Sequence, residues 1–246
     1  MTRERQLVET FVEVADTLVD DFDVIDFLLT LAGRCVQLLD VDAAGITLID
    51  QRGHLHAAAA STESAQLVEL FELQNDAGPC IDCCRTGSPV VNADLAANAQ
   101  RWPRFAEAAR DSGFVAVHAL PLRLRETVIG ALNLFSAQSR VLTEDDIRAG
   151  QALADVATIG ILAQRGLHQA ELLAAQLQSA LNSRIVIEQA KGVLAERRQI
   201  SVDEAFTLLR DHARQHNVRL SDVARDVAEG PAASGLWHAS AMRRST

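Results

Sequence analysis

Hydrophobic residues follow two different periods along the chain, and these periods predict the order of helices and strands. A period of about 3.6 residues is typical of an amphipathic helix, and strict alternation is typical of a half-buried strand. The helical pattern predicts two helices within residues 4–39, divided at the acidic stretch 20–23, and further helices at 63–74 and 101–112. The alternating pattern predicts strands at residues 44–50, 54–60, 90–91, 115–124 and 128–135. This order predicts an α+β fold, with helices on the faces of an antiparallel sheet.

A long helix is expected after the last strand. Thr143 followed by Asp146 supplies a helix start. From residue 149 to 181, positions spaced alternately by four and three hold only apolar or small residues, which is the pattern of a coiled-coil seam. Two interpretations stay open, namely the seam of a parallel homodimer and a helix buried within one chain's own bundle. The expected seam residues are Leu153, Val156, Ala163, Leu167, Ala170, Ala174, Leu177 and Leu181.

Three helices are predicted between residues 181 and 230. Ser201 and Glu204 form a capping box at the start of the second, and Ser221 is expected to cap the third. The first helix has an apolar face that includes Ala190, Val193 and Leu194.

Three basic residues lie beside that apolar face. Arg184, Lys191 and Arg198 recur every seven residues, so they follow one side of the helix. Such a stripe is either a solvated helix face, with Glu188 as a partner of Arg184, or a surface for phosphate groups.

The stretch 181–230 resembles the ANTAR family, whose members are RNA-binding output domains of bacterial transcription antiterminators. The resemblance rests on the phrases SRIVIEQAKGVL, DEAF and LSDVA, although family members commonly carry Met where Ala195 stands. It implies an ANTAR domain at residues 182–230 that binds a pair of small RNA hairpins as a dimer. The residues that it implies in RNA binding are Arg184, Gln189, Ala190, Lys191, Gly192, Arg197, Arg198, Arg210 and Arg214.

The preceding part of the chain resembles a GAF domain. The phrases GITLID, GPCID, RTGSPV, RWPRF, ALPLRL and IGALNLF are similar to the GAF half of actinobacterial GAF–ANTAR proteins. The resemblance implies a sensory domain at residues 23–142, preceded by an N-terminal helix at 1–22 and joined to the ANTAR domain by a coiled-coil helix at 143–181. Trp102 is expected to close the pocket of the sensory domain. GAF domains bind varied small molecules or nothing, so no cofactor is assigned and the signal is left open.

Three cysteines, Cys80, Cys83 and Cys84, form the cluster C-x-x-C-C. Packing beside a pocket, redox sensing and metal binding are all open interpretations. A thiol at a helix start can have a lowered pKa, and free methionine sulfoxide reductases of the GAF fold use loop cysteines. Zinc would need a fourth ligand. The candidate fourth ligands are His54, His56 and His118.

The sequence contains no phosphate-binding loop and no hydrolase or metalloprotease motif, so an enzyme is not expected. Two alternatives to the RNA-binding regulator are kept. One is a thiol redox enzyme or redox sensor that uses the C-x-x-C-C cluster. The other is a protein-interaction module that does not bind RNA.

Charge is distributed unevenly along the chain. The formal net charge is −10, which would oppose nucleic-acid binding if it were spread evenly. Residues 170–246 hold ten Lys and Arg against nine Asp and Glu, whereas the remainder holds thirteen against twenty-four. The net charge of the C-terminal part therefore does not oppose RNA binding. We expect a cytoplasmic protein without a membrane partner, because no long apolar run and no export signal are present, and a disordered tail at 231–246.

Overall fold

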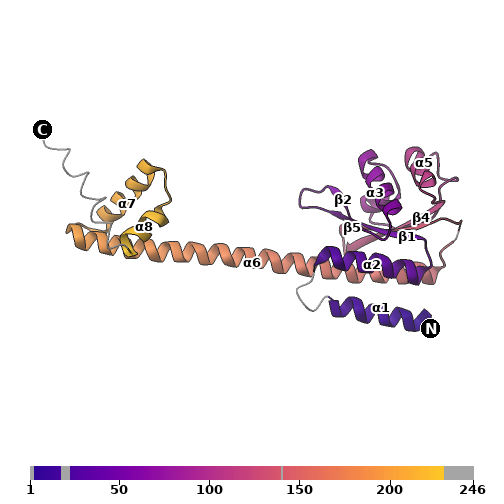
Figure 1. Ribbon diagram of the computed structural model, residues 1–246, viewed down its shortest axis with the longest axis horizontal. Helices are drawn as coiled ribbons and strands as arrows, with labels where there is room; N and C mark the ends of the chain where they lie inside the picture. Colours follow the sequence, from indigo (N-terminus) through magenta and orange to yellow (C-terminus); the bar gives the residue numbers. More distant parts are fainter. Residues whose placement is uncertain (1–2, 18–22, 140, 230–246) are drawn as a thin grey trace. The chain divides into compact units, whose positions relative to one another are not determined.

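The computed structural model describes residues 3–17, 23–139 and 141–229. The chain forms two compact units, Met1–Gly166 and Leu167–Thr246 (Figure 1). The predicted α+β fold is confirmed. The expected tail at 231–246 lies outside the described residues, as does the acidic stretch 20–22. No helix in the described part of the chain is long and apolar enough to cross a membrane.

The elements follow the order that the hydrophobic periods predict. The helices of the first unit are α1 (Arg3–Thr17), α2 (Val24–Leu39), α3 (Glu63–Asn75), α4 (Pro79–Thr86) and α5 (Pro103–Asp111). Its strands are β1 (Ala43–Ile49), β2 (Leu55–Ala60), β3 (Val90–Asp94), β4 (Ala116–Leu124) and β5 (Thr127–Ser136). Helix α6 (Glu144–Arg198) begins in the first unit and ends in the second, which also holds α7 (Val202–His216) and α8 (Leu220–Glu229).

The sheet has the strand order β2-β1-β5-β4-β3, and every neighbouring pair is antiparallel. Its register decides what lies beneath α3 and α4. Asn133 on β5 is paired with Gly45 on one side and with Ala119 on the other. Because both neighbours are small, the sheet leaves room beside Asn133 for side chains from the helices above it.

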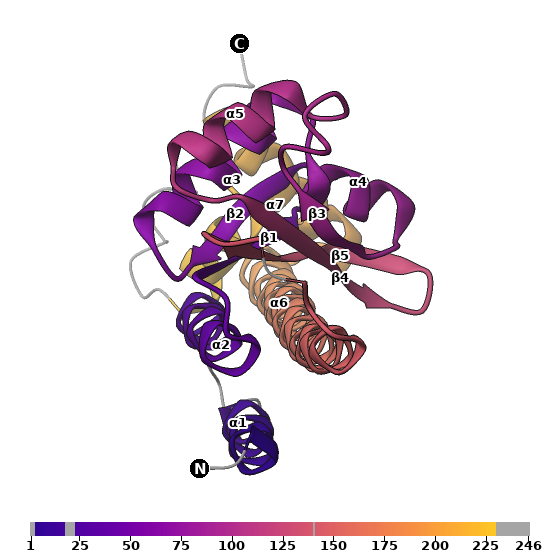
Figure 2. The same ribbon diagram turned by 90° about the vertical axis from the view of Figure 1, so that its right-hand side faces the viewer.

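Helices cover both faces of this sheet, as Figure 2 shows for the first unit. One face packs against α2 and the first part of α6, around Leu28, Leu39, Leu132 and Leu153. The other face carries α3, α4 and α5 (Figure 2). The α4 side of this layer is built from small and thiol-bearing residues, whereas the α5 side is aromatic.

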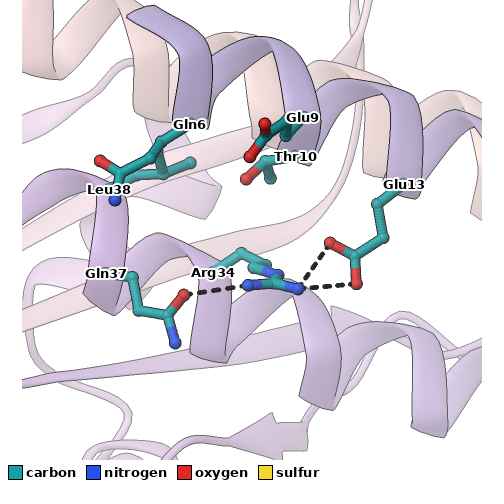
Figure 3. A pocket seen from close by; sticks show the side chains of 7 residues that line it. All are labelled: Gln6, Glu9, Thr10, Glu13, Arg34, Gln37 and Leu38. Carbon is teal, nitrogen blue, oxygen red and sulfur yellow. Dashed lines mark hydrogen bonds and ion pairs between the residues drawn. The ribbon is translucent and has the colours of Figure 1, made fainter. Parts of the chain in front are cut away.

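Helix α1 packs on the outside of α2. The two helices enclose a polar cavity of about 130 Å³, in which Arg34 of α2 reaches Glu13 of α1 at 2.8 Å and Gln37 at 3.1 Å (Figure 3). Both partners of the ion pair are about 40% exposed, at 39% and 41%, so its contribution to stability is small.

The expected helix starts are mostly confirmed. Ser201 and Glu204 form the predicted capping box of α7. Thr143 and Asp146 exchange hydrogen bonds at the start of α6, where the Asp146 N–H donates to Thr143 Oγ1 at 3.2 Å and the Thr143 N–H donates to Asp146 Oδ2 at 2.8 Å. The prediction for Ser221 is wrong, because α8 begins one residue earlier, at Leu220. Ser221 therefore lies within the first turn.

Candidate functional site

The second unit has a three-helix core, and the packing of α6 in this core determines where its basic residues lie. The end of α6 packs against α7 and α8 through Ala190, Leu194, Leu209 and Ala224, each at most 4% exposed. Positions on the other side of α6 therefore point to solvent. Arg184, Lys191 and Arg198 follow one line along α6 at the edge of this core, as the spacing of seven predicts, with Arg184 exposed and the other two partly buried.

Lys191 is held more firmly than a surface lysine usually is. Its Nζ lies 3.0 and 2.9 Å from the two carboxylate oxygens of Glu188, and it sits 5.5 Å from the ring centroid of Phe206 on α7. The side chain is only 15% exposed. Glu188 thus pairs with Lys191, and not with Arg184 as in the solvated-face interpretation. A cation fixed in this way at the edge of the core can meet a phosphate without much loss of side-chain freedom.

The other expected RNA-binding residues do not form one face. Gln189 and Arg197 lie about 160° and 120° around the helix from Lys191, at 100° per residue. Gly192 is exposed, and a methyl group added there would meet nothing within 4 Å, so the surface beside Lys191 is open. Arg210 and Arg214 project from the exposed face of α7. Ala190 is wrong as a contact residue, because it is fully buried in the three-helix core.

The expected coiled-coil seam divides into two parts. Leu153 is fully buried against the sheet of the first unit, so the expectation that it forms a seam with a second chain is wrong. Val156 is half-buried against the same core, and its place in a seam stays a prediction. The residues from Ala163 onward have no such cover. Leu167, Leu177 and Leu181 are 66%, 58% and 56% exposed. Ala163, Ala170 and Ala174 are exposed as well.

The cysteine cluster lies on α4, with its thiols turned toward the sheet. Cys80 and Cys83 are buried, Cys84 is half-buried, and Cys80 Sγ lies 3.0 Å from Thr47 Oγ1. The neighbouring Cys84 thiol and burial raise the pKa of Cys80 well above its usual value, and burial raises the pKa of Cys83 to about 12. The expectation of a lowered thiol pKa is therefore wrong for Cys80 and Cys83, which stay protonated and unreactive.

The histidines do not complete a metal site with these thiols. No group of three metal-ligating side chains occurs among the described residues. His118 is fully buried, and its Nδ1 accepts a hydrogen bond from the Asn92 N–H at 2.8 Å. Burial lowers the pKa of His118 to about 4, so the ring is neutral.

Two glutamates that the sequence patterns did not single out lie on the buried face of α3. Glu69 is 0% exposed and Glu72 is 2% exposed. Glu69 Oε1 accepts a hydrogen bond from Asn133 Nδ2 at 2.7 Å, in the space left by Gly45. Glu72 Oε1 accepts the backbone N–H of Cys80 at 2.7 Å, at the start of α4. The two carboxyl groups thus connect α3 to the sheet and to α4.

Burial changes the proton affinity of both carboxyl groups. It raises the pKa of Glu69 to about 8, although the hydrogen bond from Asn133 acts in the opposite direction. It also raises the pKa of Glu72 well above its usual value. Helical phase could have found these residues, because Glu69 and Glu72 share the face of Ala65 and Val68. Leu67 and Leu70 on the opposite face obscure that signal, since they are exposed apolar residues.

A cavity of about 390 Å³ lies between the first two strands, α3 and α4, and neither Glu69 nor Glu72 is among its lining residues. Leu73, Ile81 and Cys84 form part of its wall, together with Ile49 and Leu55 of the first two strands. Nearby, Trp102 is 3% exposed. Its Nε1 donates to Asp82 Oδ2 of α4 at 3.0 Å, and Arg101 forms an ion pair with the same oxygen at 2.7 Å. Trp102 therefore fastens the turn before α5 to α4, and its expected role in closing the sensory pocket stays a prediction.

Comparison with known protein families gives two matches. A family model described as GAF domain matches residues 23–162, and one described as ANTAR domain matches residues 175–227. Comparison with curated proteins found no match.

Solved structures resemble the first unit in fold. The GAF domain of a phosphoenolpyruvate-protein phosphotransferase from Coxiella burnetii has a TM-score of 0.55 at 16% identity, covering 67% of this chain and 98% of that chain. A phycoerythrobilin-bound GAF domain of a cyanobacterial phytochrome has a TM-score of 0.53 at 16% identity, covering 68% and 98%. A free methionine-R-sulfoxide reductase from Neisseria meningitidis, in complex with its substrate, has a TM-score of 0.52 at 20% identity, covering 67% and 91%. At these identities the likeness establishes the fold alone.

Proposed function

We propose, because the chain belongs to the GAF domain family and also carries an ANTAR domain at residues 175–227, that it is a signal-responsive RNA-binding regulator of transcription antitermination. This combination fits a regulator with an RNA-binding output, and it suggests a regulatory protein in place of an enzyme. In the proposal, the GAF domain senses a signal and the ANTAR domain binds paired RNA hairpins. Stabilised hairpins would then prevent a terminator from forming.

The observation that carries the proposal is the anchored cation of α6 at the edge of the three-helix core. Lys191 is fixed by Glu188 and Phe206, and the surface next to it, at Gly192, is open. Arg184 and Arg198 extend the positive charge along the same side of the helix. Phosphate contacts supply affinity for RNA, and exposed loop bases supply sequence information.

A homodimer is part of the proposal. The leucines at positions 167, 177 and 181 are more than half exposed, and they recur in the heptad spacing of a coiled coil. Burying them against a second copy would remove this apolar surface from water. Two ANTAR domains joined in this way suit an RNA with two hairpins, because the second contact becomes intramolecular.

The thiol-based alternatives receive no support from the site. The Cys84 thiol and burial raise the pKa of Cys80, burial raises the pKa of Cys83, and a thiol with a raised pKa is a poor nucleophile and a poor redox sensor. The interaction-module alternative differs from the proposal only in whether RNA binds, so one experiment separates them.

That experiment has two steps. RNA that co-purifies with the full chain is sequenced, and the recovered hairpins are then used in binding measurements. We expect Lys191→Ala combined with Arg198→Ala to weaken hairpin binding by about tenfold or more at fixed salt, and to reduce the salt dependence of the affinity. Helical content should stay unchanged.

Arg225→Ala on α8 is the matched control, since Arg225 is a half-exposed arginine outside the α6 stripe. We expect it to leave the affinity within about threefold of the unchanged chain. Equal affinity of the double variant and the unchanged chain would remove Lys191 and Arg198 from the site. Recovery of no specific RNA would favour the interaction module.

A further inference from the structure

Strand β3 lies at an edge of the sheet and contains a β-bulge. Its pairing with β4 shifts register between Val90 and Ala93, so that two residues of β3 lie opposite His118 of β4. One of the two is Asn92, whose φ of 54° lies in the left-handed region. Bulges re-aim side chains, and residues in sparsely populated backbone regions cluster where the structure uses them. This bulge directs Asn92 toward the segment that leads into α6.

Asn92 joins three segments of the chain. Its backbone N–H donates to Nδ1 of His118 at 2.8 Å. Its side-chain amide forms a reciprocal pair with the backbone of Leu142, in which Oδ1 accepts the Leu142 N–H at 2.8 Å and Nδ2 donates to the Leu142 carbonyl at 3.3 Å. These two residues are 50 positions apart, and Leu142 lies directly before the cap of α6. The start of α6 is thus attached to the edge of the sheet.

The two residues that Asn92 joins are fixed in the core, whereas Asn92 itself is exposed. His118 is 0% exposed and Leu142 is 2% exposed, and Leu142 belongs to the same apolar cluster as Leu39 and Leu153. Hydrogen bonds at an exposed residue can exchange with water. This attachment can therefore open while the core beside it stays packed.

A second attachment limits how far such an opening extends. Further along α6, Gln151 Nε2 donates to the Pro121 carbonyl of β4 at 3.0 Å. The helix also approaches the sheet closely at Gly150, where an added methyl group would lie 2.8 Å from a methyl carbon of Leu120. Opening at Asn92 would therefore free the first turns of α6 and leave the following turns in place.

We propose that Asn92 is a latch, whose hydrogen bonds to Leu142 and His118 hold the start of α6 on the sheet and couple the β3 edge to this helix. Helix α6 begins in the GAF domain and continues into the ANTAR domain. The inference thus deepens the regulatory part of the proposed function and rests on it for that meaning, but the latch itself does not depend on RNA binding. A bulge that only protects a sheet edge from pairing would need no contact with α6.

Hydrogen exchange of the full chain, followed by mass spectrometry, measures the latch directly. Asn92→Gly is the test variant, because glycine tolerates the left-handed conformation and keeps the backbone N–H but removes both bonds to Leu142. We expect exchange of the amides at 142–150 to rise by about tenfold or more. The midpoint of urea unfolding should change little, because Asn92 is exposed.

Asn98→Gly is the matched control. Asn98 lies in the loop after β3, and its Nδ2 donates to the Asp94 carbonyl at 2.9 Å, so this substitution removes a side-chain bond of the same kind that does not involve α6. It should leave exchange at 142–150 unchanged. Asn92→Asp keeps the acceptor for the Leu142 N–H, so its effect should be smaller than that of Asn92→Gly.

Coupling between the helix and the strand is tested from the other side. Thr143→Ala removes the hydroxyl that caps the Asp146 N–H, so it loosens the start of α6. We expect exchange at 90–94 to rise by about threefold or more in this variant, and to show no further rise when Thr143→Ala is added to Asn92→Gly.

Unchanged exchange at 142–150 in Asn92→Gly, or an equal rise in Asn98→Gly, would overturn the latch. The same response of 90–94 to Thr143→Ala with and without Asn92 would overturn the coupling. Hairpin binding is measured on the same samples. Unchanged exchange with intact hairpin binding would refute this inference alone, and the expected exchange without hairpin binding would refute the RNA-binding proposal alone.

Discussion

Glu69 holds its proton over a pH range in which an exposed glutamate has lost it. Its pKa in the folded chain is about 8, against an ordinary value near 4.5 that applies after unfolding. Between these values the folded state binds more protons than the unfolded state, so the free energy of unfolding falls as pH rises. Glu72 acts in the same direction, because burial raises its pKa as well.

Glu69→Gln should therefore stabilise the chain most at the upper end of this window. We expect a gain of about 1–3 kcal/mol in the free energy of unfolding near pH 8 and little change near pH 5, because glutamine keeps the polar contact with Asn133 and cannot ionise. Urea unfolding at both pH values measures the effect. Glu126→Gln, in the exposed turn between β4 and β5, is the control, and its free energy of unfolding should show no pH-dependent gain. A loss of stability near pH 8 would mean that the carboxylate is satisfied in the folded chain.

The four cysteines should react with an alkylating reagent in a fixed order. Cys84 is half-buried and lines a cavity, whereas Cys35, Cys80 and Cys83 are buried. Burial also raises the pKa of Cys35 to about 12. We expect iodoacetamide to label Cys84 first in the folded chain and the other three only after unfolding, as followed by mass spectrometry. Early labelling of Cys80 would instead support a redox role for the cluster.

Some of these functional residues can be identified from the sequence, and others cannot. The cluster of thiols and the basic stripe are visible as spacings, because residue type and helical phase are enough to define them. The burial of Glu69 depends on Gly45, which comes beside Asn133 only through strand pairing, and the burial of Glu72 depends on Gly78 at the start of α4. Helical phase places the glutamates with Ala65 and Val68, but the exposed leucines on the opposite face obscure which face of α3 is buried.

At the scale of elements, α6 carries two apolar faces with different partners. Leu153, Ala157 and Ile161 face the sheet and are at most 1% exposed. The periodicity predicts a long helix, but it assigns Leu153 and Val156 to a seam with a second chain. An apolar stripe in a sequence does not show whether a second chain or the chain's own sheet covers it. In this chain, the sheet covers Leu153. From Ala163 to Leu181 the stripe is exposed within the chain.

Two leucines of α6 provide a matched pair for testing the seam. Leu177 lies on it and is 58% exposed, and Leu172 is 52% exposed but lies at least about 140° from every seam position. Leu177→Glu should raise the dimer dissociation constant by about 100-fold or more, because it removes apolar burial and places like charges opposite each other. Leu172→Glu should change it by less than about threefold. Analytical ultracentrifugation measures both, and equal effects would exclude this seam.

At the scale of the whole molecule, the order of domains is the part that sequence predicts best. The phrases of both families are local, so residues 23–162 and 175–227 can be assigned without knowledge of packing. Assembly of two chains is a property of surfaces, and neither phrase encodes it. In the proposed function, the link between two ANTAR domains depends on whether the exposed part of α6 pairs with a second copy.

Avidity for RNA measures that link directly. An RNA with two hairpins should bind the unchanged chain about 100-fold or more tightly than an RNA with one, because the second ANTAR domain of a dimer binds at high effective concentration. Leu177→Glu should remove this advantage while changing the affinity for a single hairpin by less than about threefold, since residue 177 lies about two helical turns before Arg184, the first residue of the basic stripe. Leu172→Glu should keep the advantage. Fluorescence anisotropy with both RNAs at fixed salt gives the ratio, and a ratio that survives Leu177→Glu would show that one chain alone binds both hairpins.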